Sequence, residues 1–152
     1  MRTAIALALF LLPVATSPAR SSSSEWIDAE GARVRLVTTG LPDEQGNLEG
    51  ALEILLAPGW KTYWRDPGET GVPPSLDLDA SNNLAGATFS FPAPHRFRDD
   101  YATWAGYKEP VALPVRLTLE NPTAPISANI FLGVCETICI PVQGALKLDP
   151  AH

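Results

Sequence analysis

Histidine, methionine and cysteine are scarce in this sequence, and their scarcity limits the chemistry that the chain can perform. Among 152 residues there are two histidines, two cysteines and one methionine. The sequence has no Gly-x-Ser-x-Gly, no His-Glu-x-x-His and no phosphate-binding glycine loop, and its cysteines are not spaced as Cys-x-x-Cys. Hydrolase, zinc protease, nucleotide-binding and thioredoxin-like sites are therefore not indicated. Any chemistry of this chain is expected to involve sulfur.

Basic residues are also few. Eleven Lys and Arg stand against seventeen Asp and Glu, and the formal net charge is -6. A nucleic-acid-binding protein holds the phosphate backbone with clustered Lys and Arg side chains, which this chain lacks. We therefore expect no nucleic-acid partner, and solubility accounts for the acidic character.

Long apolar runs are missing after the N-terminus. Residues 1–19 combine a positive charge at Arg2, an apolar run over 4–15 and small residues up to Ala19. This pattern predicts a secretory signal peptide, and the run is too short to span a bilayer. We expect a single mature domain, residues 20–152, that does not itself cross a membrane. The expected location is a bacterial periplasm, where a thiol pair can be oxidised and reduced.

Fifteen prolines interrupt every long helical pattern. Between them, several short runs alternate apolar and polar side chains, as half-buried strands do. These runs are 34–36, 76–79, 88–91, 115–119 and 146–149. Two further runs, 52–57 and 129–134, are more continuously apolar, which predicts central strands covered on both sides. Pro- and Gly-containing segments such as 66–68 are expected to form turns. The sequence thus predicts an all-β fold, an immunoglobulin-like β-sandwich with little helix.

The two cysteines, Cys135 and Cys139, are separated by three residues. In one continuous strand their Cα atoms would be roughly 13 Å apart, whereas a disulfide needs about 4.4 to 6.8 Å. The chain must therefore turn between them. The β-branched Thr137 and Ile138, followed closely by a proline, disfavour a helical turn. We predict a tight hairpin with residues 136–138 at its tip and the two sulfurs facing each other across adjacent strand ends.

Several uses of this pair are open. As a stabilising crosslink, a disulfide that closes five residues contributes only roughly 2 kcal/mol, and so short a loop is more typical of a bond that opens and closes. Two unpaired buried thiols are disfavoured in an oxidising compartment. A Cu(I) or Zn(II) site would need a further ligand, and of the two histidines, His95 and the terminal His152, only His95 is plausible. We expect no bound metal or other cofactor.

Segments along nearly the whole mature chain carry a family resemblance. They are Gly59 to Trp64, Phe91-Pro92, Gly106 to Glu109, Leu113 to Val115, and Val134 to Pro141. In this order they resemble the N-terminal periplasmic domain of the DsbD family, with the ScsB branch, named for suppression of copper sensitivity, the most similar. The Cys-x-x-x-Cys-Ile-Pro segment is the most specific element. The resemblance implies an immunoglobulin-like domain whose cysteine pair relays electrons.

The resemblance also implies partners and residue roles. In the family, a membrane-embedded electron donor reduces a thioredoxin-like domain, and that domain reduces the N-terminal domain. The N-terminal domain then reduces periplasmic thiol-disulfide proteins. Cys139 is expected to form the mixed disulfides and Cys135 to resolve them. A cap loop with an aromatic side chain shields the family's cysteines; Trp104 is the candidate here and Tyr107 the alternative, although Trp104 could equally be an ordinary core residue. Tyr63 stands where the family has an active-site tyrosine, but core packing also fits its position.

Two departures from the family pattern stand out. The family's cysteines are more widely spaced, and acidic residues precede its cap aromatic where this chain has Ala102 and Thr103. The nearest acidic side chains are Asp99, Asp100 and Glu136, and Glu136 is expected to raise the pKa of the neighbouring thiol. Neither membrane segments nor a thioredoxin-like domain follow in the sequence, so either separate subunits supply electrons or the domain acts as a freestanding exchange, binding or chaperone module. A third interpretation is that the chain is a fragment of a longer reductase. The alternative function is a noncatalytic β-sandwich that binds a partner protein or Cu(I).

Overall fold

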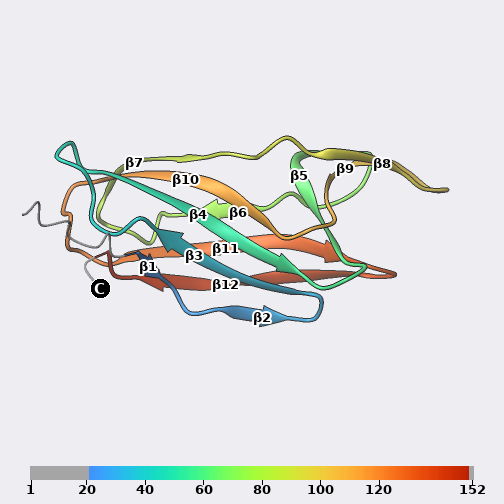
Figure 1. Cartoon of the computed structure of the whole chain (residues 1–152), viewed down its shortest axis with the longest axis horizontal. Helices are drawn as coiled ribbons and strands as arrows, with labels where there is room; N and C mark the ends of the chain where they lie inside the picture. The colour runs from blue at the N-terminus through green and yellow to red at the C-terminus, as the bar shows by residue number, and fades with distance from the viewer. Residues whose placement is uncertain (1–20, 151–152) are drawn as a thin grey trace, which may run out of the picture.

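The computed structural model describes residues 21–150, and the predicted signal peptide, residues 1–19, lies outside them. Within this range the regular structure consists of twelve β-strands in two six-stranded antiparallel sheets. The sheets pack face to face, and in Figure 1 they overlap along the line of sight, the first sheet running from β7 at the top to β2 at the bottom. The predicted all-β, immunoglobulin-like sandwich is confirmed. In the described part of the chain, no helix has the length and apolar character needed to cross a membrane.

The first sheet contains most of the N-terminal half of the chain. Its strand order is β1-β3-β4-β10-β7, with β2 paired to β3. The strands are β1 (Ser22–Ser23), β2 (Ile27–Ala29), β3 (Ala32–Thr38), β4 (Asn47–Leu56), β7 (Leu84–Phe89) and β10 (Val111–Leu119).

The second sheet contains both cysteines. Its strand order is β12-β11-β5-β9-β8, and β6 also pairs with β11. The strands are β5 (Lys61–Gly68), β6 (Ser75–Asp77), β8 (His95–Arg98), β9 (Thr103–Tyr107), β11 (Ile126–Cys135) and β12 (Cys139–Leu148). β6 pairs with the middle of β11, whereas the start of β5 pairs with its end, where the first cysteine lies.

The hydrophobic core lies between the two sheets. On β3 and β10 the side chains alternate between buried and less buried positions, because successive residues of a strand point to opposite faces. The bulkiest fully buried residues are Leu36, Leu48, Leu52, Ile54, Leu113, Leu117, Ile126, Leu132 and Leu146. Each such side chain contributes roughly 1.5 to 3 kcal/mol on burial. This cluster holds the sheets together and contains no cysteine.

The two continuously apolar runs are not covered on both sides along their length, so that prediction was wrong. Leu55 on β4 is 39% exposed and Phe131 on β11 is 37% exposed. Both strands occupy central places in their sheets, but the outer face of each is largely open. Only the end of β11, residues 132–135, is buried on both faces. There a Cβ on Gly133 would lie 3.3 Å from the Cβ of Val72, so the chain after β5 covers the outer face.

The predicted turn at residues 66–68 was also wrong. These residues belong to the end of β5. The pairing of β5 with β9 shifts register between Tyr63 and Gly68, and Gly68 adopts a positive φ of 92°. A strand irregularity thus uses the proline and glycine that usually mark a turn, because both disrupt a regular ladder without ending the strand.

Candidate functional site

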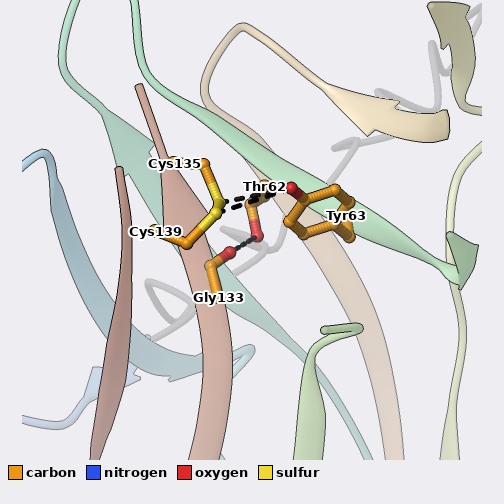
Figure 2. Close-up of a disulfide and its surroundings, with 5 residues drawn as sticks. All are labelled: Thr62, Tyr63, Gly133, Cys135 and Cys139. Carbon is orange, nitrogen blue, oxygen red and sulfur yellow. Dashed lines mark hydrogen bonds between the residues drawn. A yellow bond between two sulfur atoms is a disulfide. The ribbon is translucent and has the colours of Figure 1, made fainter. Parts of the chain in front are cut away.

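The cysteines lie at the turn of the β11–β12 hairpin. Cys135 ends β11, Cys139 begins β12, and the two residues are paired in register. Their sulfurs form a disulfide with the Cα atoms 4.1 Å apart, drawn in Figure 2. The N–H of Glu136 donates to the carbonyl of Ile138 at 3.1 Å and closes the turn. The predicted hairpin with residues 136–138 at its tip is confirmed. The tip lies at the end of the sandwich that also carries β8 and β9, at the right of Figure 1.

The two cysteines differ in their access to solvent. Cys135 is only 1% exposed, whereas Cys139 is an exposed residue. An external thiolate can therefore approach Cys139 while the fold blocks the way to Cys135. Disulfide exchange requires in-line access to one sulfur, and Cys139 is the exposed cysteine of this pair.

Cross-strand pairing determines which side chains share a face with the disulfide. Residues directly opposite each other in an antiparallel pair point to the same face of the sheet. Cys135 lies opposite Lys61 of β5, and Tyr63, two residues further along β5, lies opposite Gly106 of β9. Trp104, two residues before Gly106, points the same way. This is the outer face of the second sheet.

A small aromatic cluster covers Cys135 on that face. Tyr63 and Trp104 pack with Cys135, all three nearly fully buried, and Phe97 of β8 packs against them. The ring of Trp104 meets that of Tyr63 edge-on at 5.7 Å and stacks on that of Phe97 at 4.2 Å. The cluster is separate from the core between the sheets. The disulfide therefore has its own apolar cover.

Tyr63 makes a direct polar contact with the disulfide. Its hydroxyl lies 3.2 Å from the Cys135 sulfur and 3.9 Å from the Cys139 sulfur, as Figure 2 shows. Burial, and secondarily the Asp99 carboxylate, raises the pKa of Tyr63. Its hydroxyl therefore stays protonated and can donate a hydrogen bond to the sulfur. Gly71 packs on the ring, where a Cβ would lie 2.4 Å from ring atoms.

Tyr107 lies on the other face of the sheet. It stands three residues after Trp104, and an odd spacing along a strand reverses the face. Tyr107 packs into the core between the sheets, and its hydroxyl donates to the Pro92 carbonyl at 2.8 Å. Burial raises its pKa to about 12. The structure therefore brings Tyr63 and Trp104 to the cysteines and does not bring Tyr107.

Trp104 contacts the cysteine cluster from a strand. It lies within β9, which pairs with β5 on one side and β8 on the other. The segment between β8 and β9, residues 99–102, carries Tyr101, which is 97% exposed. Asp99 closes this segment by accepting the N–H groups of Tyr101 and Ala102, which lower its pKa. The expected aromatic contact is thus made by a paired strand, and the aromatic side chain of the adjacent loop faces solvent.

Two lysines that were not singled out from the sequence lie beside this cluster. The ammonium of Lys61 lies 4.2 Å from the centroid of the Trp104 ring, and that of Lys108 lies 4.3 Å from the centroid of Phe97. The period of two along β5 could have placed Lys61 on the face of Tyr63. The sequence offered no comparable indication that Phe97 would pack against this cluster.

The metal interpretation finds no support in the arrangement of ligands. Within residues 21–150 no three His, Cys, Asp or Glu side chains are close enough together to hold a metal ion. His95 therefore does not join the two cysteines. The carboxylate of Glu136 lies against the turn before β5, where a Cβ on Gly59 would be 3.0 Å from its Oε1.

Comparisons with known proteins fit this geometry. Residues 30–150 match the family described as thiol:disulfide interchange protein DsbD, N-terminal. The crystal structure of the N-terminal periplasmic domain of ScsB from Proteus mirabilis is similar, with a TM-score of 0.73 and 29% sequence identity. The match covers 84% of this chain and 51% of that chain, so this chain spans about half the length of that structure.

A second solved structure is more distant. The N-terminal domain of DsbD from Neisseria meningitidis, in the reduced form, matches with 14% identity and a TM-score of 0.44, over 79% of this chain and 86% of that chain. No curated protein sequence matches the chain.

Proposed function

The chain belongs to the family of DsbD N-terminal domains, and from this premise we propose that it is a periplasmic thiol:disulfide interchange domain that relays reducing equivalents through Cys135 and Cys139. The observation that carries the proposal is the disulfide itself, which joins an exposed cysteine to a buried one at a hairpin tip. The named periplasmic location of the similar ScsB domain supports the compartment.

The proposed reaction transfers two electrons from a dithiol to a disulfide. A thiolate of the reduced partner attacks the Cys139 sulfur, a bond forms between them, and the bond to Cys135 breaks with its electron pair left on the Cys135 sulfur. The second thiolate of the partner then attacks the partner's own sulfur in the mixed disulfide, and the bond to Cys139 breaks with its electron pair left on the Cys139 sulfur. The partner leaves as a disulfide, and this domain becomes a dithiol. In reverse, the Cys139 thiolate reduces the disulfide of an acceptor, and Cys135 resolves the intermediate.

The proposed partners are thioredoxin-like periplasmic proteins on both sides of the relay. The electron donor would itself be reduced by a membrane-embedded protein, and the acceptors would be other thiol-disulfide proteins. The overall activity is that of a protein-disulfide reductase type of thiol-disulfide oxidoreductase. The family membership supports these assignments, and the hairpin tip at one end of the sandwich fits docking against a second domain.

The neighbouring aromatic residues are proposed to protect and tune the pair. Trp104 shields the buried sulfur from small oxidants, because a thiolate in an oxidising compartment is otherwise oxidised beyond the disulfide level. Tyr63 donates its hydroxyl hydrogen bond to the Cys135 sulfur, which is 3.2 Å away. Tyr107 has no such role, since it lies in the main core.

Single-cysteine variants test this proposal. The probe is a thioredoxin-like protein that keeps only its attacking cysteine, activated as the mixed disulfide with thionitrobenzoate. Reduced Cys135→Ser, which retains the exposed Cys139, is expected to release coloured thionitrobenzoate and form a covalent complex. The matched control Cys139→Ser retains only the buried thiol and is expected to react far more slowly. Failure of both variants to react would overturn the function, and faster reaction of Cys139→Ser would reverse the assigned roles.

A further inference from the structure

Lys61 is the direct cross-strand neighbour of Cys135. The two residues face each other where β5 pairs with the end of β11, and Cys135 faces Cys139 on its other side. Directly opposed residues share a face, with Cβ atoms about 4.5 to 5.5 Å apart. Lys61, Cys135 and Cys139 therefore form a row across three adjacent strands, on the face where the disulfide opens.

Among the described residues Lys61 forms no ion pair within 4.0 Å, and its charge acts on the Asp99 carboxylate only at longer range, where it helps to lower the pKa of that group. Within the part of the chain that the structure describes, the ion pairs closer than 4.0 Å involve Arg33, Arg35 and Arg116, all on the other sheet. The ammonium of Lys61 instead lies on the face of Trp104, 4.2 Å from the ring centroid. A cation–π contact at a partly exposed site stabilises by only about 0.5 to 1 kcal/mol, so the ammonium can leave the ring at little cost.

The disulfide state gives that ammonium no anion to bind. Reduction provides an anion, because breaking the bond leaves a negative charge on the Cys135 sulfur. Cys135 is only 1% exposed. A buried thiolate is unfavourable unless an opposite charge or a hydrogen bond compensates for its lost hydration. Tyr63 supplies the hydrogen bond. A nearby positive charge would stabilise the thiolate further.

We propose that Lys61 provides this charge, stabilising the thiolate of Cys135 as the leaving group when a partner thiolate attacks Cys139. The inference rests on the proposed exchange function. The bond from the partner sulfur to Cys139 forms, the bond from Cys139 to Cys135 breaks, and the electron pair remains on the Cys135 sulfur. The ammonium moves from the Trp104 ring toward that sulfur and keeps its proton. A partner dithiol is the reductant, so the electrons balance.

Other charged groups near the cluster are less well placed. Lys108 lies over Phe97, 4.3 Å from its centroid, and is 5.7 Å from the Trp104 centroid. Phe97 stacks on Trp104 and is not paired with Cys135 across strands. The Asp99 carboxylate accepts hydrogen bonds from the backbone of its own turn and interacts at longer range with both Lys61 and Lys108, so it does not distinguish the two lysines. The carboxylate of Glu136 lies against Gly59. Lys61 is thus the cation that cross-strand pairing assigns to the buried sulfur.

The test titrates one thiol in isolation. In the Cys139→Ser background only Cys135 ionises as a thiol, and its thiolate is followed by absorbance at 240 nm. Adding Lys61→Met is expected to raise the pKa of the Cys135 thiol by about one unit or more, as removal of a close opposite charge does. Lys61→Arg is expected to preserve the pKa, and the matched control Lys108→Met to leave it within a few tenths of a unit.

A second readout uses the two-cysteine protein. Lys61→Met is expected to slow reduction of the disulfide by dithiothreitol severalfold, because a leaving thiol of higher pKa departs more slowly. Lys61→Arg is expected to restore the rate. An unchanged pKa and rate in Lys61→Met would overturn this inference while leaving the exchange function intact. Failure of the unaltered protein to exchange with thioredoxin-like partners would instead remove the function, whatever Lys61 does to the pKa.

Discussion

Reduction of the disulfide is expected to weaken the fold only slightly. The crosslinked residues are four positions apart, so the disulfide closes a loop of five residues. The loss of chain entropy in the unfolded state for such a loop corresponds to about 2 kcal/mol at 25 °C. The core between the sheets contains no cysteine and does not depend on the bond. The reduced domain should therefore stay folded, with an unfolding free energy about 2 kcal/mol lower.

Urea unfolding of the oxidised and the reduced protein, followed by circular dichroism, measures this difference. The double variant Cys135→Ser, Cys139→Ser serves as a control that cannot reoxidise during the experiment. By thermodynamic linkage, the disulfide of the folded protein should be harder to reduce than that of the unfolded chain by about 40 mV, at about 30 mV for each 1.4 kcal/mol.

A much larger loss would refute this reasoning. If reduction unfolded the domain, or lowered the unfolding free energy by more than about 4 kcal/mol, the bond would act as a structural crosslink of the kind that closes long loops. The proposed relay passes through the dithiol state in every cycle, and a loss of that size would be a large part of the roughly 5 to 15 kcal/mol by which whole domains are stable.

Three further predictions concern the aromatic residues. Tyr63→Phe removes the donor 3.2 Å from the Cys135 sulfur. A hydrogen bond to a charged group contributes about 1.5 to 3 kcal/mol, so the pKa of the Cys135 thiol should rise by about one to two units in a titration at 240 nm. An unchanged pKa would show that the hydroxyl does not act on the thiolate. Trp104→Ala should lower the unfolding free energy by about 3 to 5 kcal/mol and speed alkylation of the buried thiol by iodoacetamide, whereas slow alkylation in a folded variant would end its role as a shield. Burial raises the pKa of Tyr107 to about 12, above its unfolded value of about 10. The contribution of this group to stability is therefore complete below pH 10 and is lost as the pH rises through 12. Urea unfolding between pH 9 and 12 should show this fall in stability, and Tyr107→Phe should make the fall smaller.

The hairpin could be predicted from the sequence because covalent geometry leaves few alternatives. Two cysteines three residues apart cannot bond within a straight strand, and the residues around them oppose a helical turn. The structure places Cys135 and Cys139 as a register pair at the turn. The strands were predictable for a similar reason, since alternation along β10 and β12 reports one buried face.

The partners of the disulfide were harder to predict, because they come from other strands. Trp104 and Tyr107 are both aromatic and three residues apart, so a period of two places them on opposite faces, but the sequence does not say which face the cysteines share. Pairing of β9 with β5 decides in favour of Trp104. Lys61 acquires its significance only through its register with Cys135, which depends on long-range pairing between β5 and β11.

Runs of apolar residues were misleading where the environment decides burial. Leu55 and Phe131 lie within such runs and yet face outward, because the central strands of this sandwich have only one covered face over most of their length. Proline and glycine at 66–68 indicated a turn, whereas the chain uses them at a strand irregularity. Local composition does not distinguish a turn from a strand irregularity, since proline and glycine interrupt a regular ladder in either one.

The reduction potential of the Cys135–Cys139 disulfide tests the central claim most directly. The protein is equilibrated at pH 7 with mixtures of reduced and oxidised dithiothreitol or glutathione, and the thiol fraction is counted after acid quenching and alkylation. The account predicts a single two-electron transition with a midpoint above about -300 mV, within reach of thioredoxin-like proteins near -270 mV and higher. A midpoint well below about -300 mV, in the range of structural disulfides, would contradict it.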